Sequence, residues 1–143
     1  MNTLVDCSKV YVETSSFSTK DNQFYGVFAK DDIKTGAIVE KGLMKRLSSN
    51  DNKEFDGMKN PYVFTWSDDT PNYTWAFASG CATFYNTNLE EQSNTNMIRN
   101  FNENKFEIIA TKDIKKGDEL THTYKSLKWR TSFVELYAKL NQN

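Results

Sequence analysis

The residue types that most often carry nucleophilic or metal chemistry are scarce in this chain. It has one histidine, His122, and two cysteines, Cys7 and Cys81. Cysteines so few and so far apart do not match the clustered ligands of a zinc site or a disulfide framework. His122 lies in an alternating run, and the chain lacks the glycine-flanked turn that exposes a catalytic serine. These counts argue against a serine or cysteine hydrolase and predict no metal site.

Glycines and acidic residues do not form a familiar site either. None of the six glycines has the spacing of a phosphate-binding loop. Four acids lie in polar loop segments, where a solvated surface is the ordinary explanation: Asp68, Asp69, Glu90 and Glu91. Lys and Arg number 18 against 19 Asp and Glu, and this balance argues against a direct nucleic-acid binder. The chemistry left to the chain is that of tyrosine hydroxyls, asparagine amides and backbone groups.

The elements that must position such groups are short and mostly β. Alternating runs rich in β-branched and aromatic residues predict strands at 10–12, 26–29, 37–40, 62–66, 97–99, 106–110 and 119–123. The polar stretch 100–104 joins two of these runs and predicts a hairpin loop. Phe133, Leu136, Tyr137 and Leu140 have helical spacing, and Ser132 begins a capping box. A weak helical turn is expected within 50–59. The fold class is therefore mainly β with a C-terminal α-helix.

Two segments of the chain echo one another. Residues 27–40 and 108–121 each contain Asp-Ile-Lys-x-Gly, at 32–36 and at 113–117. In each copy we expect the aspartate to cap its own turn and the glycine to supply a positive φ before the next strand. The isoleucine side chain of each copy would pack into the hydrophobic core. The echo predicts two similar β-corners with a structural role.

Length and hydropathy set the class of protein. The 143 residues predict one domain, with a core at about 9–129 and a helix at about 132–141. Phe, Tyr and Trp number 10, 7 and 3, so aromatic side chains must supply much of the core. No apolar run approaches the ~20 residues of a membrane span, and no signal peptide is visible. We expect an intracellular protein of the cytoplasm or nucleus that does not bind a membrane.

An ordered series of motifs runs through most of the chain. Tyr-Gly-Val-Phe-Ala at 25–29 is followed by Tyr-Val-Phe-x-Trp at 62–66, Phe-Tyr-Asn at 84–86 and Gly-Asp-Glu-Leu-Thr-x-x-Tyr at 117–124. In order and spacing this series resembles the SET-domain protein lysine methyltransferases, especially the short stand-alone members of bacteria and viruses. The resemblance extends from about residue 9 to 129. It implies small curved β-sheets and a C-terminal segment that threads beneath a preceding loop in a knot-like core.

The resemblance also implies a binding site for the methyl donor S-adenosylmethionine. The loop 24–26 would lay its backbone against the donor, because glycine allows close approach. Asn86 matches the asparagine of the family's Asn-His-Ser signature and would hydrogen-bond the donor's amino-acid end. Trp129 would cover the adenine. The expected donor-binding residues are Phe24, Tyr25, Gly26, Tyr85, Asn86, Thr87, Tyr124 and Trp129.

The catalytic residues implied by the resemblance are two tyrosines. Tyr124 matches the catalytic tyrosine where the lysine channel meets the donor, and Tyr62 matches an aromatic that lines this channel. The reaction is an in-line displacement by a neutral amine, whereas a free lysine has a pKa near ~10.4. An apolar channel beside the sulfonium lowers that pKa through desolvation and like charge. Tyr124 would orient the reacting groups without acting as a base.

The chain departs from the family pattern at several positions. Asn-His-Ser is replaced by Asn-Thr-Asn at 86–88, and the Pro-Asn that follows it is missing, with Asn94 and Asn96 both able to take its place. Phe24 stands where the first glycine of Gly-x-Gly is expected, and His122 where a tyrosine is frequent. These losses keep a second interpretation open, in which the domain binds a peptide or the donor without turnover.

The function expected is S-adenosylmethionine-dependent methylation of a protein lysine. The segment 41–60 falls where SET domains carry a variable insert against the peptide groove. Acidic loops near the site would attract a Lys/Arg-rich substrate such as a histone tail, through exposed charges that are sensitive to salt. The alternative is a degenerate SET domain that acts as a non-catalytic binding module.

Overall fold

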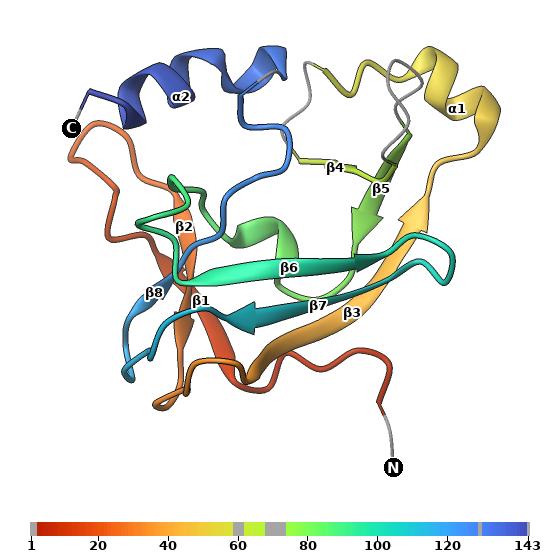
Figure 1. Ribbon diagram of the computed structural model, residues 1–143. Helices are drawn as coiled ribbons and strands as arrows, with labels where there is room; N and C mark the ends of the chain where they lie inside the picture. The colour runs from red at the N-terminus through yellow and green to blue at the C-terminus, as the bar shows by residue number, and fades with distance from the viewer. Residues whose placement is uncertain (1–2, 59–61, 68–73, 129, 143) are drawn as a thin grey trace.

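Two antiparallel sheets form the body of the computed structural model, which describes residues 3–58, 62–67, 74–128 and 130–142 (Figure 1). The smaller sheet has the order β1-β2-β8, and the larger has the order β4-β5-β3-β7-β6. The strands are β1 (Val10–Thr14), β2 (Tyr25–Ala29), β3 (Ile38–Arg46), β4 (Phe64–Thr65), β5 (Trp75–Ala78), β6 (Thr95–Asn100), β7 (Lys105–Ala110) and β8 (Glu119–Leu120). The mainly β fold expected from the alternating runs is confirmed.

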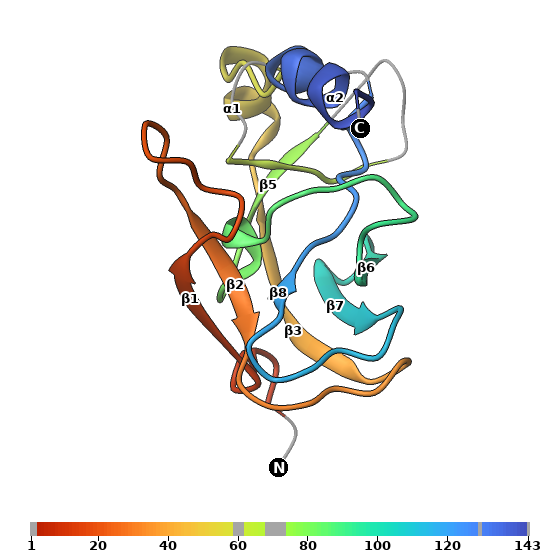
Figure 2. The same ribbon diagram turned by 90° about the vertical axis from the view of Figure 1, so that its left-hand side faces the viewer.

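Four short helical elements accompany the sheets: α1 (Ser49–Glu54), η1 (Ala82–Phe84), η2 (Thr131–Phe133) and α2 (Val134–Leu140). Figures 1 and 2 both place α1 and α2 at one end of the molecule, opposite the N-terminus. The side chain of Ser48 caps α1 by accepting a hydrogen bond from the Asp51 amide at 3.1 Å. No helix in the described part of the chain is long and apolar enough to cross a membrane.

One local prediction is wrong, and one strand had no prediction. The capping box expected at Ser132 does not form: α2 begins after Phe133 with no side-chain cap, and the Ser132 hydroxyl is buried without a partner among the described residues. The strand Trp75–Ala78 was not predicted, because its run Trp-Ala-Phe-Ala lacks β-branched residues and does not alternate in polarity. By contrast, β6 and β7 form the predicted hairpin, with Asn100 paired to Lys105.

The two echoing corners lie against each other. Ile33 and Ile114 form an isolated antiparallel bridge in which each amide donates to the other carbonyl at 2.8 Å. The glycines of both corners have the expected positive φ, near 89° and 88°. Each aspartate, however, caps the opposite corner: Asp113 accepts from the Thr35 amide and Asp32 from the Lys116 amide, both at 2.9 Å. The two repeated corners, at 32–36 and 113–117, therefore stabilise each other although they lie far apart in the sequence.

The segment that follows the second corner threads through the molecule. Residues 119–124, here called the threaded segment, pass between the chain at Asn86 and the start of β6. Parallel bridges join Asn86 to Thr121 and Thr95 to His122. The Asn94 carboxamide completes the crossing, since its nitrogen donates to the Glu119 carbonyl and its oxygen accepts from the Thr121 amide, both at 2.9 Å. Of the two asparagines left open by the sequence, Asn94 therefore holds the threaded segment, whereas Asn96 is exposed on β6.

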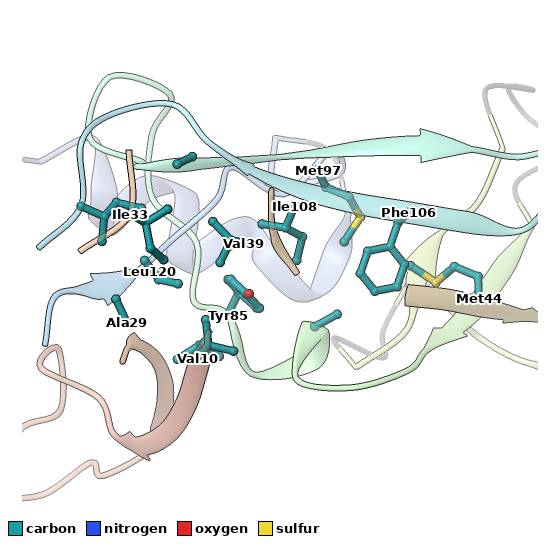
Figure 3. Packing of buried hydrophobic residues seen from close by; sticks show 14 of the residues in the cluster. Val10, Ala29, Ile33, Val39, Met44, Tyr85, Met97, Phe106, Ile108 and Leu120 are labelled. Carbon is teal, nitrogen blue, oxygen red and sulfur yellow. The ribbon is translucent and has the colours of Figure 1, made fainter. Parts of the chain in front are cut away.

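The hydrophobic core fills the space between the two sheets. Val27 and Leu120 from the smaller sheet and Ile108 from the larger are fully buried. Figure 3 shows Tyr85 within this cluster, together with Val39, Ile108 and Leu120. This core packs against the chain on both sides of the threaded segment and so positions Tyr124 at its end.

Candidate active site

Tyr124 ends the threaded segment and lies next to the chain at 85–87. Its amide donates to the Thr87 hydroxyl at 3.0 Å, and its own hydroxyl donates to the Tyr85 carbonyl at 2.6 Å. Burial raises the pKa of Tyr124 above its usual value, although the charge of Arg130 opposes this shift. The hydroxyl therefore stays protonated at neutral pH and its proton is already donated. Tyr124 can orient a ligand but is not suited to act as a base.

A small cavity lies beside Tyr124. Its volume is about 30 Å³, roughly twice what a single buried water requires. The walls come from the chain around β4, from η1, from β6 and from the segment that follows β8. The lining residues are Tyr62, Val63, Phe64, Thr65, Ala82, Thr83, Arg99, His122, Tyr124, Lys125, Ser126, Arg130 and Phe133. The two tyrosines expected at a lysine channel, Tyr62 and Tyr124, thus line one cavity, and Tyr62 is 71% exposed.

Arg130 forms one wall of this cavity and is almost completely buried. Its guanidinium donates to the Val63 carbonyl at 2.8 Å and to the Thr65 hydroxyl at 2.9 Å. The rings of Trp75 and Phe133 lie 4.7 and 5.0 Å from its central carbon. Burial lowers the pKa of Arg130 to about 10, so it remains charged at neutral pH. Arg130 ties β4 to the chain that follows the threaded segment.

The side chain of Asn86 lies between the 25–26 loop and the threaded segment. Its amide nitrogen donates to the Tyr25 carbonyl at 3.0 Å, to Glu119 Oε2 at 2.9 Å and to the Ser15 hydroxyl at 3.2 Å. A Cβ on Gly26 would collide with the Glu119 carboxylate, so any larger residue here would displace this carboxylate. The structure therefore brings together Tyr25, Gly26 and Asn86, three of the residues that the resemblance assigns to the donor site.

Glu119 is a member of this cluster that the sequence analysis missed. Besides Asn86, its carboxylate accepts hydrogen bonds from the hydroxyls of Ser15 and Ser16 and from the Ser16 amide, at 2.6–2.9 Å. The Gly-Asp-Glu-Leu motif contains Glu119, but only the fold reveals that its partners lie about a hundred residues earlier. The two serines lie in a polar turn and carry no sequence signal of their own.

Tyr85 and Phe24 are placed differently from the other expected donor-site residues. The Tyr85 ring lies in the core, and its hydroxyl donates to Glu40 at 2.9 Å, so only its backbone carbonyl reaches Tyr124. Phe24 is half-buried, and its carbonyl accepts from the Ser15 amide at 2.8 Å. Tyr25 is 61% exposed and contacts the Phe84 ring edge-on. Trp129 lies outside the described residues.

A half-buried arginine and a buried histidine complete the described site. Arg99 and His122 line the cavity, and neither was expected there. The chain has only three arginines in a lysine-rich sequence, which is the one signal that could have drawn attention to Arg99. Among the described residues, no group of histidine, cysteine and acidic side chains could hold a metal ion. The site is therefore built from tyrosines, amides and buried cations.

Comparisons with known proteins agree with this geometry. A model of the SET domain family matches residues 25–125. The fold is similar to the crystal structure of a provisionally assigned histone methyltransferase of Plasmodium falciparum, with a TM-score of 0.62, 23% identity, and coverage of 85% of this chain and 96% of the other. It is also similar to a structure of ctPRC2 in complex with a trimethylated histone H3 and its lysine-to-methionine form, with a TM-score of 0.62 and 22% identity. That match covers 82% of this chain and 14% of the other. No curated protein matches the chain.

These findings identify the class. The fold is that of the SET lysine methyltransferases, with curled sheets and a short C-terminal helix. The chain belongs to the SET domain family, since the family model covers most of its length.

Proposed function

We propose that this chain transfers a methyl group from S-adenosylmethionine to a lysine side chain of a protein. The observation that carries the proposal is the threaded segment, which fixes Tyr124 against the carbonyl of Tyr85 and against Thr87. The same segment holds the Glu119 carboxylate against Asn86 and Gly26. The threaded segment thereby connects the small cavity beside Tyr124 with the polar cluster of Asn86, Gly26 and Glu119, where we expect the donor to bind.

The polar cluster fits the amino-acid end of the donor. The Tyr25 carbonyl is an acceptor suited to an ammonium group, and the Glu119 carboxylate, whose lone pairs already accept hydrogen bonds, adds negative charge beside it. Both are held in place by the Asn86 amide nitrogen, while no described residue donates to the Asn86 side-chain oxygen. When bound, S-adenosylmethionine supplies an electrophilic methyl on a sulfonium. The chain's own part is to bind the amino-acid end, to orient the amine at Tyr124 and to keep water away from the cavity.

The proposed acceptor is a lysine of a basic protein tail. Two of the acids expected to attract such a tail, Asp68 and Asp69, lie outside the described residues. Glu90 lines an open groove of about 780 Å³, together with Arg99, Lys125 and Lys128. The described groove is therefore mixed in charge. We expect methyl transfer to a basic tail to slow as salt rises, because exposed charges are screened. A rate that does not change with salt would exclude a basic tail as the substrate, but it would not contradict lysine methylation.

The second candidate is a module that binds the donor or a peptide without turnover. The altered Asn-Thr-Asn at 86–88 favours it, because Thr87 is buried and its hydroxyl is used by the Tyr124 amide. Calorimetric binding of S-adenosylmethionine, followed by incorporation of labelled methyl into core histones, separates the two. Binding with incorporation at lysine supports the enzyme. Binding without incorporation into histones or other protein acceptors supports the module.

A further inference from the structure

The His122 side chain is buried without a hydrogen-bond partner. It is 1% exposed, and no described residue bonds its Nδ1 or its Nε2. A neutral imidazole carries one donor and one acceptor, and leaving each unpaired costs about 1–3 kcal/mol. The neighbouring rings of Tyr85 and Tyr124 meet it edge-on, with centroids 5.9 and 5.1 Å away, and supply no hydrogen bond to it. His122 lines the cavity beside Tyr124 with both ring nitrogens enclosed, so a ligand that enters and widens this cavity can become its partner.

Arg99 lies in the same wall and is also incompletely paired. Its one described hydrogen bond runs from Nη1 to the Met97 carbonyl at 3.3 Å, and its Nε has none. No described carboxylate forms an ion pair with it. Burial, together with the charge of Arg99, lowers the pKa of His122 to about 3. The imidazole is therefore neutral at physiological pH and keeps a lone pair that can accept a hydrogen bond.

The charged side chains among the described residues that line the cavity are all cationic. Arg99 comes from β6, and Lys125 and Arg130 come from the chain after the threaded segment. The other titratable groups in the walls are Tyr62, Tyr124 and His122. None of the described residues that line the cavity carries a carboxylate. An amine in this cavity meets like charge and reduced solvation, and both effects disfavour its protonated form.

We propose that Arg99 and His122 prepare the acceptor amine for methyl transfer. The guanidinium disfavours the ammonium form, and the imidazole accepts one N–H of the neutral amine and so fixes the direction of its lone pair. This inference rests on the proposed function. The ammonium releases its proton to solvent, the nitrogen lone pair then forms the bond to the methyl carbon, and the sulfur keeps the electron pair of the broken bond. His122 contacts the reacting amine, while Arg99 acts through its field.

The single histidine of the chain allows a direct test by nitrogen NMR of the imidazole. The probe is n-butylamine, which reproduces the end of a lysine side chain, added to the wild-type protein at mildly alkaline pH. We expect the acceptor nitrogen of His122 to shift on addition of the amine. The matched probe is n-butyrate. Imidazole signals that do not respond to n-butylamine, or that respond to n-butyrate instead, would overturn the assignment of this cavity to an amine.

The role of Arg99 is tested by the pH dependence of methyl transfer to core histones. In Arg99→Met the apparent pKa of the amine should rise, so that the rate at neutral pH falls about tenfold and recovers as the pH is raised. Arg46→Met is the matched control, since Arg46 is exposed and its partners are Phe101 and Asn104. Identical pH profiles for Arg99→Met and the wild type would exclude this role.

The same two experiments separate the inference from the function on which it rests. If n-butylamine shifts His122 but no protein acceptor is methylated, the amine site stands and the methyltransferase proposal fails. If histones are methylated but His122 does not respond to n-butylamine, the enzyme stands and the present inference fails.

Discussion

The proposed chemistry of the site depends on a single hydroxyl, that of Tyr124. Because this hydroxyl donates to the Tyr85 carbonyl at 2.6 Å, its oxygen is left as an acceptor of fixed direction. Tyr124→Phe removes that acceptor and keeps the ring packed against His122 and Phe133. We expect turnover to fall by about a hundredfold, as for loss of one oriented polar group at a reacting centre. Calorimetry should show unchanged affinity for S-adenosylmethionine, and equal turnover by both proteins would exclude a catalytic role.

Asn86 has a structural role in the described fold and a proposed role in donor binding. Its amide nitrogen is shared among Ser15, Tyr25 and Glu119, so Asn86→Ala leaves three acceptors without their common donor. We expect a lower melting temperature as well as loss of donor binding. Asn96→Ala, on the exposed side of β6, is the control and should change neither property. Unaltered donor affinity in Asn86→Ala would leave Asn86 with the structural role alone.

At the scale of elements, the paired corners brace the start of the threaded segment. Gly117 has a φ of 88°, and nothing lies within 4 Å of a Cβ placed there. Gly117→Ala therefore tests backbone strain alone, and should lower the free energy of unfolding by about 1–2 kcal/mol in urea. Gly117→Asn should lose less, since asparagine tolerates this region better. Equal stability of the alanine variant and the wild type would show that the corner relaxes without strain.

At the scale of the whole molecule, His122 links stability to pH. Its pKa is about 3 in the fold because of burial and Arg99, against 6.5 in an exposed histidine. Below pH 6.5, His122 therefore binds a proton in the unfolded chain but stays neutral in the folded protein. The free energy of unfolding falls as the pH decreases from about 6.5 toward 3. Glu40, whose pKa is raised by burial, acts in the opposite sense, because its contribution is lost as pH rises above the ordinary value of 4.5.

His122→Gln isolates the first of these two effects. Between pH 7 and pH 5 the wild type should lose about 2 kcal/mol of stability through the histidine, and the variant should not. Urea unfolding at the two pH values measures the difference, with Glu40 present in both proteins. Parallel pH dependences in the two proteins would contradict the burial of an uncharged His122.

Local pattern was sufficient for much of the fold, and the order of motifs was sufficient to propose part of the site. Alternation and turn residues predicted most of the strands, the hairpin at 100–104 and the positive φ of both corner glycines, because these depend on neighbouring residues. The order of motifs proposed Tyr25, Gly26, Asn86 and Tyr124 as site residues. Their roles stay predictions, while the threaded segment brings the four residues together. The ends of the elements were less predictable, as the missing cap at Ser132 shows.

Only the tertiary structure decided which distant groups meet. The exchange of caps between Asp32 and Asp113, the choice of Asn94 to hold the threaded segment, and the partners of Glu119 all join residues 25 or more positions apart. Burial decided the state of His122 in the same way, since no local pattern reveals that both ring nitrogens are enclosed beside Arg99. Hydrogen bonding and desolvation depend on what surrounds a side chain in space, whereas periodicity records only which side of an element it occupies.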